Sequence, residues 1–240
     1  MEQMHRLIEI VHTAKRMVFF GGAGVSTGSG IPDFRSEDGL YRQKYRFPPE
    51  QILSHTFFIH RTEEFFRFYR DKMLYLNAKP NAAHWKLAQW EQAGRLSAVI
   101  TQNIDGLHQM AGSKRVLELH GSVHRNTCMQ CGAHFSAQEI LNSTGIPRCP
   151  CGGIIKPDVV LYEESLDERT LMEAVREIRT ADVLLIGGTS LQVYPAASLI
   201  HYFQGDHLVL INQSSTPADK NADLLITGKI EEIFSQVDFL

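Results

Sequence analysis

The sequence predicts an α/β fold in which a doubly wound parallel sheet carries a second, smaller lobe. Three observations predict it. Short apolar runs typical of buried strands alternate with helix-like stretches, a glycine-rich turn follows the first run, and all four cysteines lie between positions 128 and 151. Strands that alternate with helices are typical of a parallel sheet covered by helices on both faces.

The predicted strands are short apolar runs, and the predicted helices are amphipathic stretches with suitable ends. The strands are Met17–Phe20, Leu96–Thr101, Val116–Leu119, Ile155–Leu161, Val183–Ile186, Leu208–Ile211 and Leu224–Thr227. The helices are residues 2–16, Asn81–Ala93 and Asp167–Arg179. The last of these has acidic residues early and arginines late, as the helix dipole favours.

Two stretches interrupt this alternation: residues 36–78 are rich in aromatic side chains, and residues 121–154 contain the cysteines. We expect a discontinuous large domain made of residues 1–35, 79–120 and 155–240. We expect the smaller lobe to combine a helical insertion, residues 36–78, with a cysteine module, residues 121–154.

The composition is that of an ordinary globular protein, with 43% hydrophobic and 21% charged residues and a net charge of −3. The apolar runs are far shorter than the roughly 20 residues that a membrane-spanning helix needs. Lysines and arginines form no long run, which argues against nucleic-acid or anionic-membrane binding as the main function. The first residues lack the pattern of a secretory signal, so we expect a cytoplasmic location.

The turn after the first strand contains Gly22, Gly24 and Gly28, a spacing one residue off the dinucleotide fingerprint. A tight turn without a ligand therefore stays an alternative. Two other strand ends, Gly188-Thr189-Ser190 and Ile211-Asn212, offer glycine, hydroxyl and amide groups. Three polar strand ends in one sheet favour a nucleotide at a Rossmann-like domain.

The cysteines form two pairs, Cys128-x-x-Cys131 and Cys149-x-Cys151, separated by 17 residues. Paired thiolates of this kind are typical of a zinc ribbon, and four of them close the coordination shell of one structural Zn²⁺. Reduced core cysteines and a disulfide are the alternatives. The second pair is one residue shorter than a usual Cys-x-x-Cys pair, so His134 is a possible substitute ligand.

The ordered motifs resemble those of the sirtuin family from about Leu7 to Phe234. The matching segments are Gly22–Arg35, Thr101–Asp105, His120-Gly121, Gly188–Ser190 and Ile211-Asn212. The resemblance implies a protein deacylase that consumes NAD as co-substrate. The resemblance implies that NAD is bound by Ala23, Thr27, Phe34, Arg35, Gln102, Asn103, Ile104, Asp105, His120, Thr189, Ser190, Asn212 and Ile230. Three of these, Asn103, Ile104 and Asp105, are implied to bind the nicotinamide.

His120 ends a strand-like run at the ligand side of a parallel sheet, where an imidazole is a natural proton acceptor near neutral pH. The resemblance implies that it is the catalytic base. In the implied mechanism the acyl-lysine oxygen attacks the ribose carbon that carries nicotinamide. His120 then takes a proton from a ribose hydroxyl, and water completes the release of lysine and O-acyl-ADP-ribose.

The segment Lys156–Glu164 is similar to the one that pairs with substrate backbone in the family, where an extended peptide adds a strand. The resemblance implies that Val160 and Tyr162 flank the acyl-lysine of a protein or peptide. The family usually has Phe-Gly-Glu where this chain has Tyr162-Glu163-Glu164. A side chain at Glu163 is therefore expected to affect the peptide groove and to favour basic peptides.

The family branch that removes succinyl or malonyl groups carries a Tyr and an Arg three residues apart in the small lobe. The matching positions here are Phe66 and Tyr69, so the resemblance implies uncharged acyl groups, acetyl first. We expect Arg67 and Arg70 to point elsewhere on the same helix. Two rival functions stay open: an NAD-dependent protein ADP-ribosyltransferase, and a non-catalytic NAD- and zinc-binding module.

Overall fold

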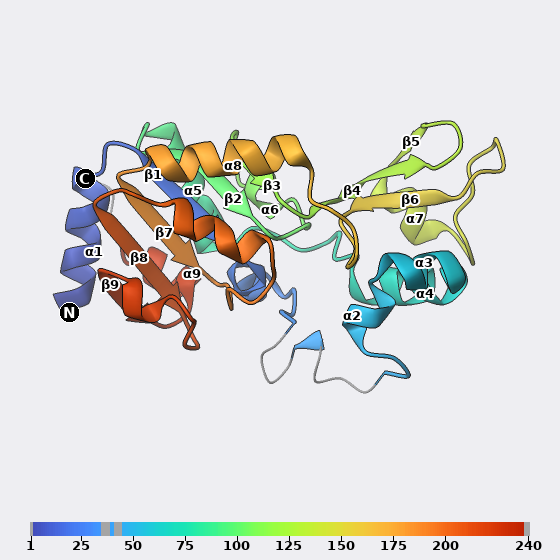
Figure 1. Ribbon diagram of the computed structural model, residues 1–240, viewed down its shortest axis with the longest axis horizontal. Coiled ribbons are helices and arrows are strands. Elements are labelled where there is room, and N and C mark those ends of the chain that lie inside the picture. Colours follow the sequence, from blue (N-terminus) through green and yellow to red (C-terminus); the bar gives the residue numbers. More distant parts are fainter. Residues whose placement is uncertain (1, 35–38, 41–44, 238–240) are drawn as a thin grey trace.

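A parallel sheet forms the larger part of the computed structural model, which describes residues 2–34, 39–40 and 45–237 (Figure 1). Within these residues the sheet has six strands in the order β3-β2-β1-β7-β8-β9, and every neighbouring pair is parallel. The strands are β1 (Met17–Gly21), β2 (Leu96–Thr101), β3 (Val116–Glu118), β7 (Val183–Gly187), β8 (His207–Asn212) and β9 (Leu224–Thr227). The strand order reverses between β1 and β7, as in a doubly wound sheet.

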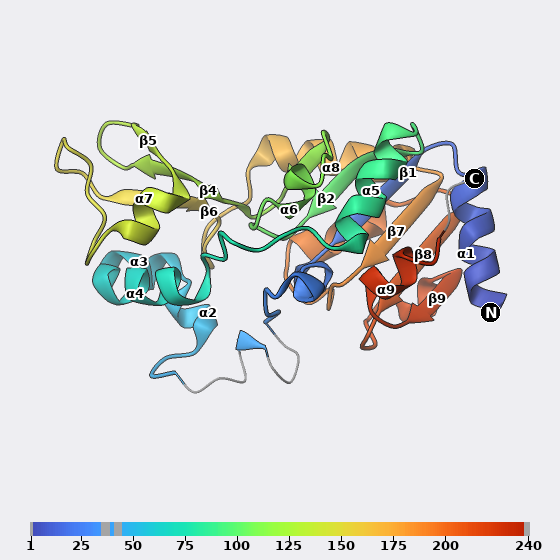
Figure 2. The same ribbon diagram turned by 180° about the vertical axis from the view of Figure 1, so that it is seen from behind.

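Helices cover both faces of this sheet, because successive strand residues point to opposite sides. On one face lie α1 (Glu2–Thr13), α5 (Ala82–Gln92) and α9 (Ile230–Phe234). Figure 2, which views the molecule from the opposite side to Figure 1, shows α5 and α9 in front of the sheet. On the other face lie α8 (Glu168–Thr180) and the 3₁₀ helix η4 (Ala196–Tyr202).

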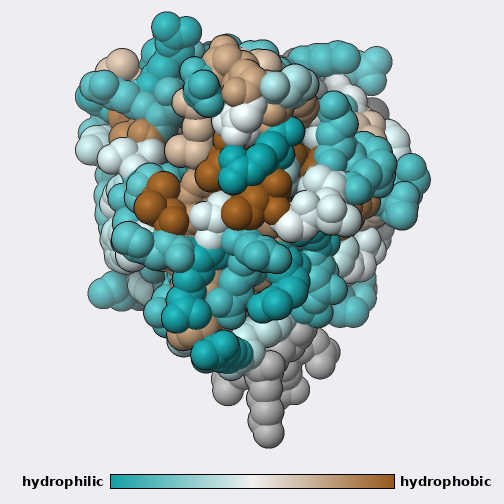
Figure 3. Space-filling view, turned by 90° about the vertical axis from the view of Figure 1, so that its right-hand side faces the viewer, coloured by the Kyte–Doolittle hydropathy of each residue, from teal (hydrophilic) through white to brown (hydrophobic). Residues whose placement is uncertain are grey.

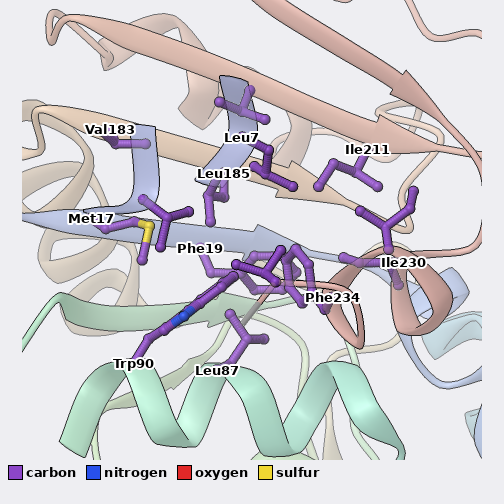
Figure 4. Close-up of a cluster of buried hydrophobic side chains, with 14 of the residues drawn as sticks. Leu7, Met17, Phe19, Leu87, Trp90, Val183, Leu185, Ile211, Ile230 and Phe234 are labelled. Atoms are coloured by element: carbon purple, nitrogen blue, oxygen red, sulfur yellow. The ribbon is translucent and has the colours of Figure 1, made fainter. Parts of the chain in front are cut away.

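The core on the α1, α5 and α9 face is made of buried apolar side chains. Met17 and Phe19 of β1 point into it, while Val18 and Phe20 point into the core on the other face. Figure 4 shows Phe19 between Trp90 of α5 and Phe234 of α9. The Phe234 ring lies 4.8 Å from the Trp90 ring and 6.2 Å from the Phe19 ring, centroid to centroid, in edge-on contacts. Such edge contacts are the arrangement that aromatic rings prefer.

The helices begin and end close to the predicted positions. Asn81 caps α5, and its side chain and His84 form a reciprocal capping box. Asp167 caps α8 by accepting a hydrogen bond from the backbone N–H of Thr170. The first helix ends at Thr13, before the predicted end at residue 16.

The smaller lobe contains a three-stranded antiparallel sheet in the order β5-β4-β6 within the described residues. The elements of this lobe are β4 (Gly121–Cys128), β5 (His134–Phe135), β6 (Ile155–Val159), α2 (Pro49–Ile52), α3 (His55–His60), α4 (Thr62–Lys72) and α7 (Ala137–Asn142). The short helix α6 (Leu107–Met110) packs against α5 of the larger part. Aromatic side chains of α3 and α4 and apolar side chains of β4 and β6 share one core.

The prediction that Ile155–Leu161 forms a strand of the parallel sheet was wrong. The strand is present as β6, but it pairs antiparallel with β4 in the small sheet. Its burial alternates residue by residue, as in a sheet with one solvated face. The glycine turn also differs from expectation, because β1 leads into two 3₁₀ turns, η1 (Ala23–Val25) and η2 (Thr27–Ser29), and not into an α-helix.

The far end of the small lobe shows hydrophobic residues at the centre of its face with hydrophilic residues around them (Figure 3). Exposed apolar side chains of this lobe include Ile59, Met129 and Leu141. In the part of the chain that the structure describes, no helix has both the length and the apolar character needed to cross a membrane.

Candidate active site

Loops after three neighbouring strands meet at the carboxyl edge of the large sheet, where the strand order reverses. The backbone N–H of Gly24, after β1, donates to the carbonyl of Gly188, after β7, at 2.8 Å. The Gln102 side chain, after β2, donates to Thr189 Oγ1 at 3.0 Å. Ligands of doubly wound sheets bind at such a crevice. The structure thus brings the first and second predicted polar strand ends into direct contact.

A buried polar network lies beside this meeting point. Ser26 Oγ donates to Asp105 Oδ2 at 2.6 Å and accepts from Asn103 Nδ2 at 3.0 Å. Asp105 Oδ1 accepts from the backbone N–H of Leu107 at 2.9 Å. Ser26 is 1% exposed and Asn103 8%. These hydrogen bonds fix the orientation of the Asn103 and Asp105 side chains. The protein, and not solvent, therefore sets the direction in which their oxygen atoms can accept further hydrogen bonds.

Sequence reasoning missed Ser26 and Asn81 as site residues. Ser26 lay inside the glycine motif but was not assigned a role. Asn81 Nδ2 donates to the carbonyl of Val25 at 2.8 Å and to Ser29 Oγ at 3.0 Å, so the cap of α5 also holds the glycine loop. The only sequence signal for this contact is the Asn at a helix start, which predicts a cap and says nothing of the loop.

His120 follows β3 at the same edge, and its ring is half-buried. Its Nδ1 lies 3.0 Å from the carbonyl oxygen of Gln102. Because a carbonyl oxygen only accepts, Nδ1 carries the proton in this contact and Nε2 carries the lone pair. Burial lowers the pKa of His120 below its usual 6.5, and the hydrogen bond to Gln102 opposes that shift. The ring is therefore a neutral base at pH 7, with Nε2 as the basic atom.

Gly121, next to this histidine, has a structural reason to be glycine. Its φ is 76°, and a Cβ at this position would clash with the carbonyl of Asp158 on β6. The absence of a side chain at this position lets β4 pass closely against β6.

The remaining predicted cofactor residues are spread along the same edge. Thr27 Oγ1 donates to the carbonyl of Gly24 at 3.0 Å, and Asn212 Nδ2 donates to the carbonyl of Ser214 at 2.8 Å. Ala23, Ile104 and Ser190 are half-buried in the loops after β1, β2 and β7. The Ile230 side chain is 2% exposed and belongs to the core of the large sheet. Phe34 packs against the small-lobe core, and Arg35 lies outside the described residues.

The predicted substrate segment joins His120 to the small-lobe helices. The backbone N–H of Val160 donates to the carbonyl of His120 at 2.9 Å. Tyr162 exchanges backbone hydrogen bonds with Leu53 and His55, at 3.0 Å each, and its side chain is 38% exposed. The segment is thus held at both ends, with Val160 directly beside the catalytic candidate.

Glu163 has a backbone conformation that is unusual for a residue with a side chain. Its φ is 75°, in the left-handed region that favours glycine. Its carboxylate accepts a hydrogen bond from the backbone N–H of Thr56 at 2.8 Å, in the first turn of α3. Hydrogen bonding from Thr56 lowers the pKa of Glu163. The side chain therefore stabilises the start of a helix, where a negative charge is favourable.

The four cysteine sulfurs lie within 4.8 Å of one another at the tip of the small lobe. Two pairs, Cys128 with Cys151 and Cys131 with Cys149, have sulfurs 3.5 Å apart. Zn–S bonds of about 2.3 Å in a tetrahedron place sulfurs roughly 3.8 Å apart, so the cluster fits one Zn²⁺. Both Cys149 and Cys151 belong to the cluster despite their short spacing. Among the described residues the cluster has no histidine, and His134 Nδ1 instead contacts Thr127.

Comparison with known proteins agrees with this architecture. A model of the Sir2 family matches residues 22–195. The chain is 56% identical over 241 residues to an NAD-dependent protein deacetylase of Clostridium acetobutylicum, with 99% of this chain and 98% of that protein covered. It is 51% identical over 234 residues to an NAD-dependent protein deacetylase of Cutibacterium acnes, with 97% and 96% covered.

Solved structures agree as well. A structure of Sir2 with a deacetylated p53 peptide and 3′-O-acetyl ADP ribose has a TM-score of 0.91 and 37% identity, covering 98% of this chain and 96% of that one. A structure of Sir2 with a p53 peptide and NAD⁺ has a TM-score of 0.87 and 38% identity, with the same coverage.

Proposed function

Because this chain belongs to the Sir2 family, the sirtuins, we infer that it is an NAD-dependent protein-lysine deacetylase. It converts acetyl-lysine and NAD into free lysine, nicotinamide and O-acetyl-ADP-ribose. The observation that carries this function is the neutral imidazole of His120, whose Nδ1–H is bonded to Gln102 and whose Nε2 is the base. It lies at the edge of the sheet where a nucleotide binds, next to the segment for the substrate.

The residues at this edge suit NAD by their chemistry. The glycines in the turns after β1 let a pyrophosphate approach the backbone closely, and neutral amides and hydroxyls suit ribose and carboxamide groups. The residues that would hold NAD are Ala23, Thr27, Phe34, Arg35, Gln102, Asn103, Ile104, Asp105, His120, Thr189, Ser190, Asn212 and Ile230. Asn103, Ile104 and Asp105 would face the nicotinamide, and Ile230 would meet the adenine through its backbone, since its side chain lies in the core.

NAD supplies a ribose carbon that accepts the acyl oxygen as nicotinamide leaves. The protein's own residues bind, orient and move a proton. Asp105 accepts a hydrogen bond from the carboxamide, Phe34 keeps water from the reacting carbon, and His120 Nε2 takes a proton from a ribose hydroxyl. The zinc site is closed by Cys128, Cys131, Cys149 and Cys151, so its ion would be structural.

The substrate is an acyl-lysine in a protein or peptide, with Val160 and Tyr162 beside it. Hydrogen bonds to His120, Leu53 and His55 hold this segment in place between the two lobes, and addition of an extended peptide as a strand is the expected mode of binding. We expect no direct nucleic-acid binding, and a cytoplasmic location stays a prediction from the sequence.

Identification of every product by mass tests this function. The purified chain is incubated with NAD and an acetyl-lysine peptide of defined mass. We expect the peptide to lose one acetyl group as one nicotinamide and one O-acetyl-ADP-ribose form. A peptide that gains the mass of ADP-ribose would show an ADP-ribosyltransferase, and no release of nicotinamide would show a binding module; either result overturns the proposal.

A further inference from the structure

Strand β4 of the small lobe holds the loop that carries Asp105. The backbone N–H of Val123 donates to the carbonyl of Ile104 at 3.0 Å. The next residue, His124, places Nε2 at 2.9 Å from the carbonyl oxygen of Asp105. The carbonyl can only accept, so Nε2 of His124 donates. Two successive residues of one strand therefore fix two successive carbonyls of the loop.

Gly106 shows how closely the His124 ring lies on this loop. Its φ is 73°, and a Cβ at this position would lie 2.8 Å from Cδ2 and 2.9 Å from Nε2 of His124. A side chain at position 106 would therefore displace the ring. One edge of the imidazole ring, Cδ2 and Nε2, therefore lies against the loop at Gly106. The rest of the His124 side chain is exposed to solvent.

A second set of contacts ties β4 to α6, the helix that follows the loop. Glu118 Oε2 accepts from Arg125 Nη1 at 2.8 Å, and Glu118 Oε1 accepts from Gln109 Nε2 at 2.9 Å. The Glu118 side chain is 8% exposed, whereas that of Arg125 is 54% exposed, so a buried carboxylate joins two groups at the surface. The loop is thus held at its backbone by Val123 and His124 and at its following helix through Glu118.

These contacts matter because they complete the restraint on Asp105. Its carboxylate is oriented by Ser26 and by the N–H of Leu107. Its own carbonyl is oriented by His124. The Asp105 carboxylate can accept a hydrogen bond from a planar carboxamide only at a suitable distance and angle. A small rotation of the Asp105 backbone would change both and weaken that hydrogen bond.

We propose that His124 is a positioning residue that sets the affinity of the nicotinamide side of the site by holding the Asp105 backbone. The proposal rests on the proposed function, in which Asp105 faces nicotinamide. His124 acts through Asp105 and touches no reacting atom. The small lobe thereby controls how strongly released nicotinamide inhibits the enzyme.

The test compares His124→Ala, His124→Gln and a control variant, His60→Ala, which removes an exposed histidine of the same lobe at the end of α3. The measurements are the inhibition constant of nicotinamide, KM for NAD and for the acetyl-peptide, and Kd for ADP-ribose, which lacks the nicotinamide ring. Loss of one hydrogen bond predicts a rise of roughly 3- to 10-fold in the inhibition constant for His124→Ala. Kd for ADP-ribose and KM for the peptide should stay within about twofold of the parent.

Glutamine places an amide N–H near the position of the imidazole Nε2, so His124→Gln should restore most of the nicotinamide affinity, and His60→Ala should match the parent. Gly106→Ala, which displaces the ring without removing it, should resemble His124→Ala. An unchanged inhibition constant in His124→Ala overturns the proposal, and so does an equal loss of ADP-ribose affinity, which would show a general structural role. A parent protein that releases no nicotinamide would overturn the proposed function itself, and this inference with it.

Discussion

The hydrogen bond from His120 Nδ1 to the carbonyl of Gln102 decides which ring nitrogen can accept a proton. The bond holds the tautomer in which Nε2 carries the lone pair, and burial keeps the ring neutral at pH 7 by lowering its pKa. The same main chain, from Gln102 to Asp105, carries the residues proposed for the nicotinamide side. One short loop after β2 would thus orient the proposed base and the proposed acceptor of the leaving group together.

Replacing His120 with Ala should abolish deacetylation while leaving NAD bound, because the base acts after the co-substrate is held. We expect kcat to fall at least about 100-fold and Kd for NAD to change less than about threefold. Single-turnover assays and calorimetry measure the two quantities, and His60→Ala serves as the control. Turnover close to that of the parent would remove His120 from the role of base.

The pH dependence of kcat should follow the same ring. The pKa of His120 is lowered below 6.5, so the active, neutral form persists from pH 8 down to pH 6.5. The rate should therefore be flat over that range and fall about tenfold per pH unit only below the lowered pKa. A steady-state profile at saturating substrates measures it. An inflection in kcat at pH 7 or above would contradict the assignment of His120 as the base with a lowered pKa.

Helix α4 carries the two positions that align with the carboxylate-binding pair of the succinyl- and malonyl-removing branch. Phe66 and Tyr69 are fully buried, and burial raises the pKa of the Tyr69 phenol. Arg67 is exposed beside Glu64, as the sequence interpretation expected. Arg70 donates to Ser143 Oγ and to the carbonyl of Gly145, and its guanidinium lies 5.8 Å from the centroid of the Phe66 ring. Arg70 is thus already engaged by groups of the small lobe.

Acetyl-lysine should accordingly be processed much faster than succinyl-lysine in the same peptide. A buried carboxylate without a guanidinium partner costs about 3 kcal/mol or more, which corresponds to at least about a hundredfold in kcat/KM. Kinetics with paired acetyl and succinyl peptides measure this ratio. Parity, or a preference for succinyl, would mean that Arg67 or Arg70 turns inward when substrate binds.

Helices α5 and α6 bury a pair of histidines that the reaction does not use. The rings of His84 and His108 lie 4.8 Å apart, and Asn81 N–H donates to His84 Nδ1 at 3.2 Å. Burial lowers the pKa of His84 to about 4, partly offset by the charge of Asp105. Burial, and then the charge of His84, lower the pKa of His108 well below its usual value.

These histidines should make the fold sensitive to acid. Near pH 6.5 the two histidines become protonated in the unfolded chain, whereas the buried rings of the folded chain stay neutral. The free energy of unfolding therefore falls as pH drops from 6.5 towards 4. One such group contributes a loss on the order of 3 kcal/mol at the lower end of this range. Urea unfolding at pH 7 and pH 5 should show a smaller difference for His84→Gln than for the parent. An equal difference in both would assign the acid sensitivity to other groups.

The arrangement of strands and helices could be predicted from the sequence because each element carries its own local pattern. Apolar runs fixed the strands, and caps at Asn81 and Asp167 fixed two helix starts. The partner of β6 could not be predicted, because a short apolar run does not state which sheet it joins. The division of the chain into domains at residues 35, 78, 120 and 154 stays a prediction.

The residues of the candidate site could be predicted only where they belong to a local motif. Motifs at strand ends identify Gln102, Asp105, His120 and Thr189, since a parallel sheet brings its carboxyl ends together. Contacts between distant segments leave no local pattern. The bond from Ser26 to Asp105 and that from His124 to the Asp105 carbonyl each depend on the fold as a whole, and the left-handed φ of Glu163 is invisible in the sequence.

One Zn²⁺ per chain is expected in the purified protein, because a closed thiolate site contributes directly to the stability of a small lobe. Removal by a strong chelator should unfold β4, β5 and β6 and abolish activity. Elemental analysis and far-ultraviolet circular dichroism before and after chelation measure both effects. Cys149→Ser and Cys151→Ser should lose zinc to a similar extent, since both sulfurs lie in the cluster. Metal-free protein with full activity would contradict the assignment.

Strand β4 also sets the distance between the metal and the base. It follows His120 directly and ends at the ligand Cys128, eight residues later. At about 3.3 Å per residue, eight residues of strand extend roughly 26 Å, so an ion held by Cys128 would lie at the far end of β4 from the imidazole. Such a separation would exceed the Debye length of about 8 Å at physiological ionic strength. We therefore expect the ion to influence turnover by keeping the strand rigid. Exchange of Zn²⁺ for Cd²⁺ should leave the pH–rate profile where it is.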